Sequence, residues 1–499
     1  MKYKSTRGSE CVSVSEALLK GLASDGGLYV PEILPGRFLD KQYLKGLSYE
    51  ETAQYVLGAF LPDIPKKALA DMIHRAYADT FSSSDIVPLR TLSSSFSVAE
   101  LFHGRTCAFK DLALSLFPYL LTWAKKNMKE TRDVLILTAT SGDTGKAALE
   151  GFRDVPGTRI QIFYPEHGVS PLQKEQMRKQ EGNNVDVVGI EGNFDDAQSA
   201  LKKIFSDHDI RRRASDAGVV FSSANSINIG RLYPQVVYYV WIWMQLIRNH
   251  AIQEDESFDI AVPTGNFGNI LAAWYAEKIG VPVRRLICAS DRNKVLADFL
   301  NSGIYDTDRP FYETESPSMD ILISSNLERF LYEISKDSRQ VQSYMEDLRM
   351  KGRYVLSAES LQQIHHVMRG GWADDSQMRE AVAEVYQKYH YLMDPHTGVA
   401  FSVYAALRKQ GNIEEDIHTV IAATAHPYKF PDATAEALGM ETEKDVYEIL
   451  QHIAAATGVS IPAPLADMEN KPVRFTQIIQ KEQMPEAVLH YAEHGRGNS

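Results

Sequence analysis

The stretch Asp133-Val-Leu-Ile-Leu-Thr-Ala-Thr140 runs directly into Ser141-Gly-Asp-Thr-Gly-Lys146 and then into Ala147-Ala-Leu-Glu150. The first segment is an apolar run of strand length, which is typical of a buried parallel strand. The second is a small polar loop, and the third favours a helix. A strand, a loop and a helix N-terminus in this order point backbone N–H groups at an anion, and Ser141 and Thr144 add hydroxyl donors. The stretch predicts an α/β fold with an anion-binding loop.

A nucleotide-binding P-loop is the competing interpretation of this loop, because Gly145-Lys146 resembles the end of that motif. The motif requires Gly at position 140 and Ser or Thr at position 147. The chain has Thr140 and Ala147 there, so the P-loop is excluded.

A second loop of the same kind follows the predicted strand Phe258–Val262 and reads Pro263-Thr-Gly-Asn-Phe-Gly-Asn-Ile-Leu-Ala-Ala273. Its two glycines let the backbone fold closely around a ligand, and an Ala-rich helix begins at once. This arrangement suits a phosphate. The glycine spacing differs from the G-x-G-x-x-G of dinucleotide-binding proteins, so a Rossmann cofactor is not expected.

Lys110 is the candidate reactive residue, in Glu100-Leu-Phe-His-Gly-Arg-Thr-Cys-Ala-Phe-Lys-Asp111. It follows two apolar residues, Ala108 and Phe109. Apolar surroundings disfavour an ammonium group, and a neutral amine attacks carbonyls, as Schiff-base lysines do. The alternative is a lysine at a helix start whose stem is buried and whose charge lies in water. The two anion-binding loops favour the reactive lysine.

Strands and helices alternate from residue 133 to about 250, which predicts a parallel sheet covered by helices. The expected strands and helices are Arg159–Tyr164, Pro171–Gly182, Val185–Ile190, Asp195–Asp207, Val219–Phe221 and Ile229–Arg248. Further strands are expected at Phe258–Val262, Arg285–Ser290 and Thr419–Ala423, with helices over most of 320–410. In the N-terminal part, Ser48–Leu61 is expected to be a helix with Ser48 as N-cap and Glu51 completing a capping box. A last helix is expected at Gln477–His490.

Composition limits the classes of function. With 499 residues, 44% hydrophobic and 24% charged, the chain is expected to be a globular protein of two or three domains. The net charge of −12 argues against nucleic acid or an anionic membrane as a partner. Three scattered cysteines form neither a disulfide framework nor a metal site, so no metal is expected. The N-terminus lacks a secretory signal and no apolar run reaches membrane-spanning length, so a cytoplasmic location is expected.

Two other stretches are of interest. Phe221–Asn228 is dense in small polar residues after a strand, and composition alone favours a plain loop there. Arg231, just beyond it, could bind a substrate phosphate, because guanidinium groups match phosphate geometry. Asp394-Pro-His-Thr-Gly398 is typical of a turn that enters a helix, and its histidine is expected to be structural.

Taken together, these motifs resemble threonine synthase, a pyridoxal-phosphate enzyme of the tryptophan-synthase-β fold type. The resemblance rests on the lysine segment, the Ser-Gly-Asp-Thr-Gly loop and the Gly-Asn-Phe-Gly-Asn loop. It extends to Tyr3–Gly8 and Ala17–Pro31 near the N-terminus and to Thr424-Ala-His-Pro427. It implies a fold-type II enzyme, with two helix-covered, mainly parallel sheets, the cofactor between them and an N-terminal α-rich unit.

The resemblance also implies the site. Lys110 would be the catalytic residue and would carry pyridoxal 5′-phosphate. The cofactor would further contact Gly265, Asn266, Phe267, Gly268, Asn269 and Thr424, with Thr424 facing the pyridine nitrogen. Ser141, Gly142, Asp143 and Thr144 would bind the substrate carboxylate or the cofactor hydroxyl. The implied reaction is that of a carbon–oxygen lyase, which converts O-phospho-L-homoserine and water to L-threonine and phosphate by γ-elimination and β-hydration.

The expected domains are an N-terminal unit (1–95), a large cofactor-binding domain (96–132 and 251–450), a smaller α/β domain (133–250) and a C-terminal extension (451–499). The protein is expected to be a monomer or a homodimer. Two alternatives stay open. One is an O-phosphohomoserine phospholyase that releases 2-oxobutanoate, ammonia and phosphate. The other is a non-catalytic binding protein that keeps the fold.

Overall fold

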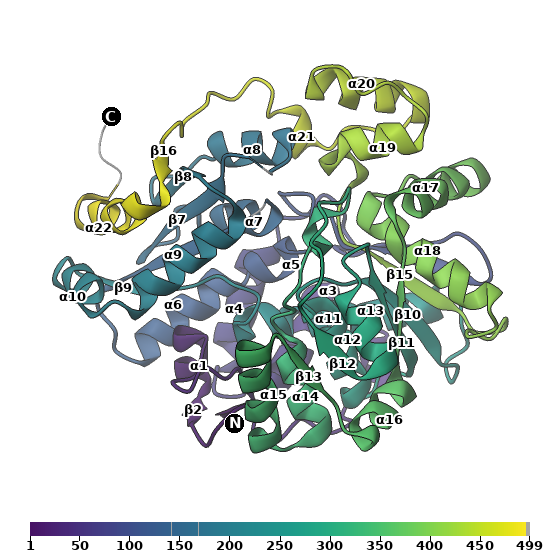
Figure 1. Cartoon of the computed structure of the whole chain (residues 1–499). Coiled ribbons are helices and arrows are strands. Elements are labelled where there is room, and N and C mark those ends of the chain that lie inside the picture. Colours follow the sequence, from purple (N-terminus) through teal and green to yellow (C-terminus); the bar gives the residue numbers. More distant parts are fainter. Residues whose placement is uncertain (141, 168, 496–499) are drawn as a thin grey trace.

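The structure, a computed structural model, describes residues 1–140, 142–167 and 169–495, with only the backbone of residue 195. Two parallel sheets, each in its own lobe, organise the chain (Figure 1). Within the described residues, no helix combines the length and apolar character that crossing a membrane requires.

The larger sheet has the strand order β14-β11-β10-β15-β5-β4, and only β4 runs antiparallel to its neighbour. Its strands are β4 (Leu89–Thr91), β5 (Phe96–Glu100), β10 (Phe258–Pro263), β11 (Val283–Ser290), β14 (Met368–Trp372) and β15 (Thr419–Ala423). Alternate residues of β10 face different cores. Ile260 packs in the core that contains helices α11 (Ile229–Arg248) and α12 (Gly268–Ile279), and Ala261 packs in the core formed with α17 (Asp375–Tyr389) and α18 (Pro395–Lys409). Both faces are therefore covered, which explains the continuous apolar run.

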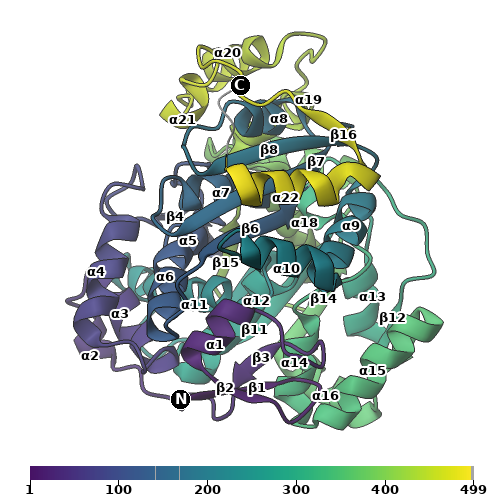
Figure 2. The same ribbon diagram turned by 90° about the vertical axis from the view of Figure 1, so that its left-hand side faces the viewer.

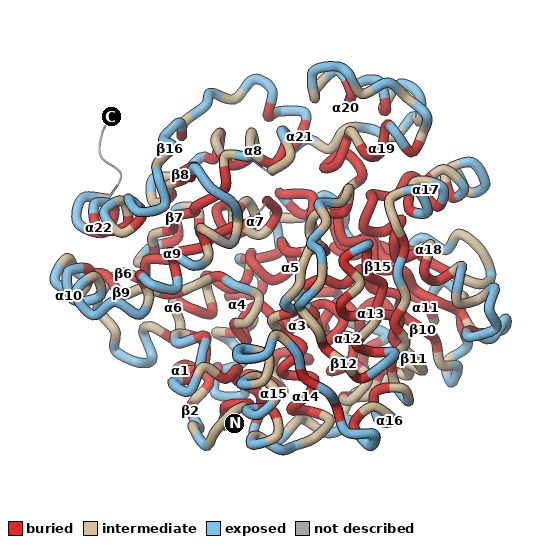
Figure 3. Tube along the Cα trace, in the orientation of Figure 1, coloured by how far each residue is buried: buried red, intermediate tan, exposed pale blue. Residues whose placement is uncertain are grey.

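The smaller sheet is entirely parallel, in the order β16-β8-β7-β6-β9. Its strands are β6 (Asp133–Ala139), β7 (Thr158–Pro165), β8 (Val185–Glu191), β9 (Val219–Ser222) and β16 (Ile478–Gln480). The helices of this part are α7 (Asp143–Phe152), α8 (Pro171–Arg178), α9 (Phe194–Ser206) and α10 (His208–Asp216). Along β6, Val134 and Ile136 share a core with α7, whereas Leu135 and Leu137 share one with α9. Figure 3 shows the central strands of both sheets as buried chain, while outer helices such as α10 are largely exposed.

The N-terminal part combines a small antiparallel sheet with helices that pack against the larger lobe. Its elements are β1 (Lys2–Ser5), β2 (Cys11–Ser13), α1 (Val14–Lys20), β3 (Tyr29–Pro31), α2 (Lys41–Leu44), α3 (Tyr49–Phe60) and α4 (Lys66–Tyr77). The predicted capping box is confirmed, because Ser48 Oγ accepts from Glu51 N while the Glu51 carboxylate accepts from Ser48 N. Helix α11 packs against both α3 and α12, so it joins this part to the larger sheet.

The remaining elements lie around the two sheets. They are α5 (Asp111–Leu114), α6 (Phe117–Asn127), α13 (Val295–Ser302), β12 (Ile304–Asp306), η1 (Pro317–Met319), α14 (Leu327–Ser335), α15 (Ser338–Lys351), β13 (Arg353–Val355), α16 (Ala358–Val367), η2 (Pro427–Lys429), α19 (Pro431–Ala437), α20 (Val446–Thr457), α21 (Ala463–Ala466), η3 (Lys481–Gln483) and α22 (Met484–His494).

The expected helix Gln477–His490 is wrong in its first part. Ile478–Gln480 forms β16, which pairs in parallel with β8, and the helix begins only at Met484. The free edge of β8 supplies hydrogen-bond partners that outweigh the local helical preference. Figure 2 shows this last strand at the edge of the smaller sheet, with α22 next to it. Helix α10 was not expected, and the helix expected at Pro171–Gly182 ends at Arg178.

Candidate active site

The segment that carries Lys110 is joined to the segment that follows β15. Ala108 and Ala425 form an isolated antiparallel bridge, Phe109 N donates to Thr424 O at 2.8 Å, and His426 N donates to Cys107 O at 3.0 Å. These bonds place Thr424, directly after the end of β15, beside the backbone of the predicted reactive lysine. Ligands of parallel sheets bind at these carboxyl ends, so the two segments form one wall of a candidate site.

Lys110 lies at the start of α5 and its side chain is buried. Its Nζ is 3.3 Å from Asp143 Oδ2 and 4.6 Å from the centre of the Phe109 ring. Burial lowers the pKa of Lys110 below its ordinary value; Asp143 opposes this shift, and the positive charges of Lys429 and Arg231 add to it. These surroundings make loss of the Lys110 proton easier than in water, the direction that a nucleophilic lysine requires.

Asp143 is the first residue of α7 and accepts from three side chains. Lys429 Nζ is 2.5 Å from Oδ1, Gln173 Nε2 donates to Oδ1 at 2.9 Å, and Lys110 approaches Oδ2. Burial alone would raise the pKa of Asp143, but the ammonium groups of Lys429 and Lys110 hold it well below its usual range. The sequence placed Asp143 in the site; it did not indicate Lys429 or Gln173.

The loop before α7 differs from the expected open cradle. The helix begins at Asp143 rather than at Ala147, and the Thr140 hydroxyl accepts from Gly142 N at 3.0 Å and from Gly145 N at 2.9 Å. Two N–H groups of the loop are therefore already bound within it. Gly142 has φ 149°, and a Cβ there would lie 2.4 Å from Gln173 Oε1, so only glycine fits. Thr144 is partly exposed in the first turn of α7, and Ser141 lies outside the described residues.

The second loop, which the sequence predicts to be a phosphate cradle, leads directly into α12. Phe267 adopts a left-handed conformation with φ 62°, and the helix begins at Gly268. A Cβ on Gly265 would lie 2.6 Å from Ser318 O, a backbone atom. Asn269 Oδ1 accepts from the hydroxyls of Tyr238 and Tyr239 at 2.6 Å each, while in the described part of the chain its buried Nδ2 has no partner. A buried unpaired donor next to helix N–H groups is suited to an anion.

A segment that the sequence did not indicate supports this cradle. Asn326 donates from its backbone N and its Nδ2 to Asn266 O, at 3.1 and 2.9 Å. Ser325 Oγ donates to Asn266 Oδ1 at 2.9 Å, and Ser324 Oγ donates to Gly265 O at 2.7 Å. These polar residues fix the backbone of the loop from outside.

Arg231 lies in the first turn of α11 with its side chain buried. Its Nη1 donates to Ala224 O at 2.7 Å, and among the described residues Nε has no partner. Burial lowers the pKa of Arg231 to about 10, and its positive charge acts on Lys110. A buried guanidinium with an unused donor close to the amine supports the expectation that Arg231 binds an anion.

His396 has both ring nitrogens engaged. Nδ1 lies 2.7 Å from Asp394 Oδ2, and Nε2 accepts from Ser318 N at 3.1 Å. Since Ser318 O lies above Gly265, His396 holds the turn that covers the cradle. This geometry agrees with the structural role expected for it.

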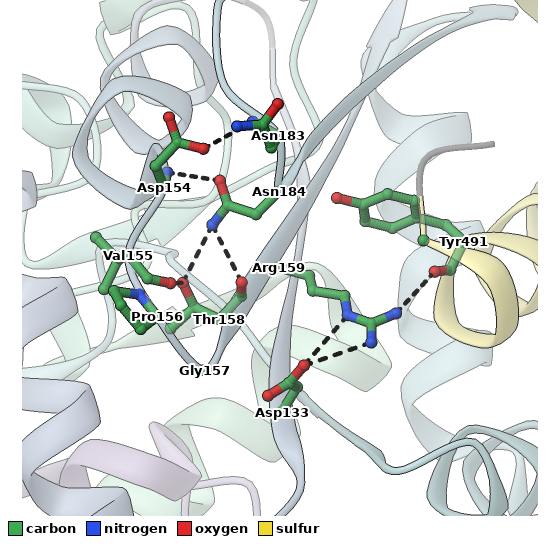
Figure 4. A pocket seen from close by; sticks show the side chains of 11 residues that line it. Asp133, Asp154, Val155, Pro156, Gly157, Thr158, Arg159, Asn183, Asn184 and Tyr491 are labelled. Atoms are coloured by element: carbon green, nitrogen blue, oxygen red, sulfur yellow. Dashed lines mark hydrogen bonds and ion pairs between the residues drawn. The ribbon is translucent and has the colours of Figure 1, made fainter. Parts of the chain in front are cut away.

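A separate cavity of about 310 Å³ lies at the other end of the smaller sheet (Figure 4). It is lined by Asp133 and Thr158, the first residues of β6 and β7, and by Tyr491 of α22. Arg159 pairs there with Asp133 and donates to the Tyr491 carbonyl. Its position at the amino ends of the strands separates this cavity from the candidate site.

Comparison with known proteins gives three family matches in chain order. They are "Threonine synthase N terminus" over residues 2–77, "Pyridoxal-phosphate dependent enzyme" over 86–425, and "Threonine synthase, C-terminal" over 397–488. The threonine synthase of Pseudomonas aeruginosa is 35% identical, with 99% of each chain covered. Human threonine synthase-like 1 is 40% identical to this chain, and the match covers 85% of this chain and 58% of the human protein.

Solved structures agree. The chain matches the crystal structure of pyridoxal-phosphate-bound threonine synthase from Brucella melitensis with a TM-score of 0.87 and 36% identity over 99% of both chains. Yeast threonine synthase gives a TM-score of 0.87 and 29% identity over 98% of both. The expected fold type, family and cofactor class are confirmed. The chain belongs to the threonine synthase family of pyridoxal-phosphate-dependent enzymes.

Proposed function

We propose that this protein is a threonine synthase that converts O-phospho-L-homoserine and water to L-threonine and phosphate. The observation that carries the proposal is the buried amine of Lys110, next to Asp143 and the positive charge of Arg231. A lysine with a lowered pKa beside unpaired anion-binding donors is what a pyridoxal-dependent reaction on a phosphorylated amino acid requires.

The residues present fit pyridoxal phosphate. The cradle Gly265–Asn269 offers the N-terminus of α12 and the unpaired Nδ2 of Asn269 to a phosphate, while Lys110 offers an amine to the aldehyde. Thr424, a hydroxyl residue after β15, would face the pyridine nitrogen, and without a carboxylate partner the ring stays mostly neutral. When bound, the cofactor supplies an electron sink that stabilises negative charge on the substrate carbons.

Lys110 performs the proton transfers. With the cofactor bound, the Lys110 amine would take and return protons at Cα and Cβ of the substrate, since one flexible side chain reaches adjacent carbons. Arg231 holds the substrate phosphate and stabilises its departure, because a guanidinium binds a phosphate dianion strongly in a buried site. Addition of water at Cβ then completes the reaction.

The loop before α7 binds the amino-acid end of the substrate. The Asp143 carboxylate is ionised and repels a substrate carboxylate, so we assign the substrate carboxylate to the backbone N–H groups of the first turn of α7 and to the hydroxyl of Thr144. The Asp143 side chain instead remains with Lys110 and Lys429. This divides the predicted substrate-binding residues Gly142, Asp143 and Thr144 into backbone and side-chain roles.

The test is product analysis after incubating the purified protein with pyridoxal phosphate and O-phosphohomoserine. Threonine and phosphate in equal amounts, both lost in Lys110→Ala, support the proposal. Phosphate with 2-oxobutanoate and ammonia would show the phospholyase alternative. This alternative is tested because the chain is also 39–40% identical to threonine synthase-like 1 proteins. Neither set of products from a protein that still binds the cofactor would refute both reactions.

We further propose that the protein acts in the cytoplasm on this small molecule, as a monomer or a homodimer. The net charge of −12 disfavours nucleic acid as a partner, and the three scattered cysteines suit a reducing compartment. Sedimentation of the purified holoenzyme separates the two oligomeric states.

A further inference from the structure

A second buried lysine lies in the site, and neither the mechanism nor the sequence motifs account for it. Lys429, the last residue of η2, has a fully buried side chain. Its Nζ lies 2.5 Å from Asp143 Oδ1 and donates to Thr106 O at 3.0 Å. Asp143 therefore stands between two amines, Lys429 on one oxygen and Lys110 on the other.

Asp143 is shared by the two lysines, and Arg231 adds a positive charge near Lys110. The other buried carboxylate nearby, Asp111, accepts from Thr106 N and Oγ1, and burial raises its pKa to about 6. Burying an unpaired charge is unfavourable enough that such a group neutralises instead. The two lysines compete for one carboxylate, so the lysine with the poorer contacts is expected to lose its proton more readily.

Geometry indicates which lysine pairs more closely with the carboxylate. Lys429 has two oxygen acceptors at 2.5 and 3.0 Å, whereas Lys110 has the Asp143 carboxylate at 3.3 Å and an aromatic ring at 4.6 Å. Short contacts to a carboxylate and a carbonyl stabilise an ammonium more than one longer contact does. The contacts therefore bind Asp143 more closely to Lys429 than to Lys110.

We propose that Lys429 is a positioning residue for the reaction: its ammonium pairs with Asp143, so that Lys110 loses its proton more readily and serves as the amine that takes the cofactor and moves protons. This rests on the proposed role of Lys110 as the cofactor-bearing residue. Lys429 acts through Asp143 and is not itself assigned a contact with substrate.

The charged groups around the pair support this division. Lys110 is faced by Asp143 from α7, Lys429 from η2 and Arg231 from α11. His396 also acts on Asp143, and Lys429 also acts on the buried groups Asp111 and Cys107. Burial lowers the pKa of Lys110 and Lys429 lowers it further, the direction that the proposal needs.

The experiment measures the rate at which apo-protein captures pyridoxal phosphate as a function of pH, which requires no substrate. Capture depends on the neutral fraction of Lys110. In Lys429→Met, Asp143 loses the Lys429 ion pair and keeps its contact with Lys110, so the midpoint is expected to rise by at least about one pH unit, which is about tenfold slower capture below the midpoint. Lys429→Arg, which keeps the charge, is expected to restore a midpoint near that of the unmodified protein.

Asp143→Asn separates this effect from general damage. Without the carboxylate, Lys110 loses its stabilising partner and its midpoint is expected to fall, opposite to Lys429→Met. Lys179→Met is the matched control, because Lys179 is also buried but binds Met468 O, Glu469 O and Glu175. If Lys429→Met does not fold by circular dichroism, Lys429→Gln carries the same expectation.

An unchanged midpoint in folded Lys429→Met, or shifts of Lys429→Met and Asp143→Asn in the same direction, would overturn the proposal. Failure of the proposed reaction can be told apart from failure of this proposal, because the reaction is tested only when O-phosphohomoserine is added, whereas cofactor capture needs no substrate. A protein with the expected midpoints that forms no threonine would refute the reaction alone. A protein that captures no pyridoxal phosphate at Lys110 would overturn both.

Discussion

Replacing Gly265 by alanine tests whether the loop before α12 holds the cofactor phosphate. The new Cβ would lie 2.6 Å from Ser318 O and 3.3 Å from Met319 Cα, and these are backbone atoms that cannot rotate away. The backbone of Gly265 is not in a left-handed conformation, so the perturbation is steric alone. Either the loop or the turn η1 must move.

The turn resists movement, because Ser318 N donates to His396 Nε2 at 3.1 Å and Met319 is buried. The loop is therefore expected to shift, and inserting a methyl group into such a packed place typically costs about 1–3 kcal/mol. If that cost falls on the state that binds phosphate, the Kd for pyridoxal phosphate rises about 5- to 150-fold, since about 1.4 kcal/mol is a factor of ten.

The assay is a titration of apo-protein with pyridoxal phosphate and, separately, with pyridoxal, which lacks the phosphate. Gly265→Ala is expected to weaken the first and leave the second nearly unchanged. The control is Gly58→Ala, because a Cβ at Gly58 in α3 meets no atom within 4 Å. Equal losses for both ligands, or no loss for either, would refute the assignment of this loop to the phosphate.

Three other outcomes are expected. Arg329→Met should destabilise the protein by at least about 3 kcal/mol in urea unfolding, because three acceptors lose the fully buried guanidinium that donates to them. Arg339 is exposed, so Arg339→Met should change the free energy of unfolding little. Equal losses of stability in the two variants would contradict this reasoning. Burial and the neighbouring Asp291 raise the pKa of Asp320 to about 8. In the folded protein Asp320 therefore keeps a proton that it loses in the unfolded protein above the ordinary pKa of 3.8. The free energy of unfolding should therefore fall as the pH rises from 3.8 to about 8, and it should fall less in Asp320→Asn. Parallel pH profiles of the free energy of unfolding for the two proteins would rule this out. Gly58→Ala should raise the free energy of unfolding by about 0.5–1 kcal/mol in urea unfolding, because alanine is favoured over glycine within a helix such as α3. A lower stability would show that the space around Gly58 does not admit a Cβ.

Local pattern predicted much of this fold. The strand at 133–139, the helix Ile229–Arg248 and the strand Thr419–Ala423 follow from periodicity and length, which act over a few residues. The capping box at Ser48 follows for the same reason. Lys110 and the Gly265–Asn269 loop could be singled out because short motifs carry their own chemistry.

Tertiary structure decided what depends on partners distant in the chain. Ile478–Gln480 is a strand only because β8 leaves an edge for it, and a local pattern does not contain that edge. Lys429 reaches Asp143 only because the segments after β6 and β15 meet at the carboxyl ends of two different sheets. Local patterns in the sequence indicated most of the elements and singled out Lys110. The lowered pKa of Lys110 comes from packing, because burial and Coulomb interactions depend on distances in space rather than on spacing in sequence.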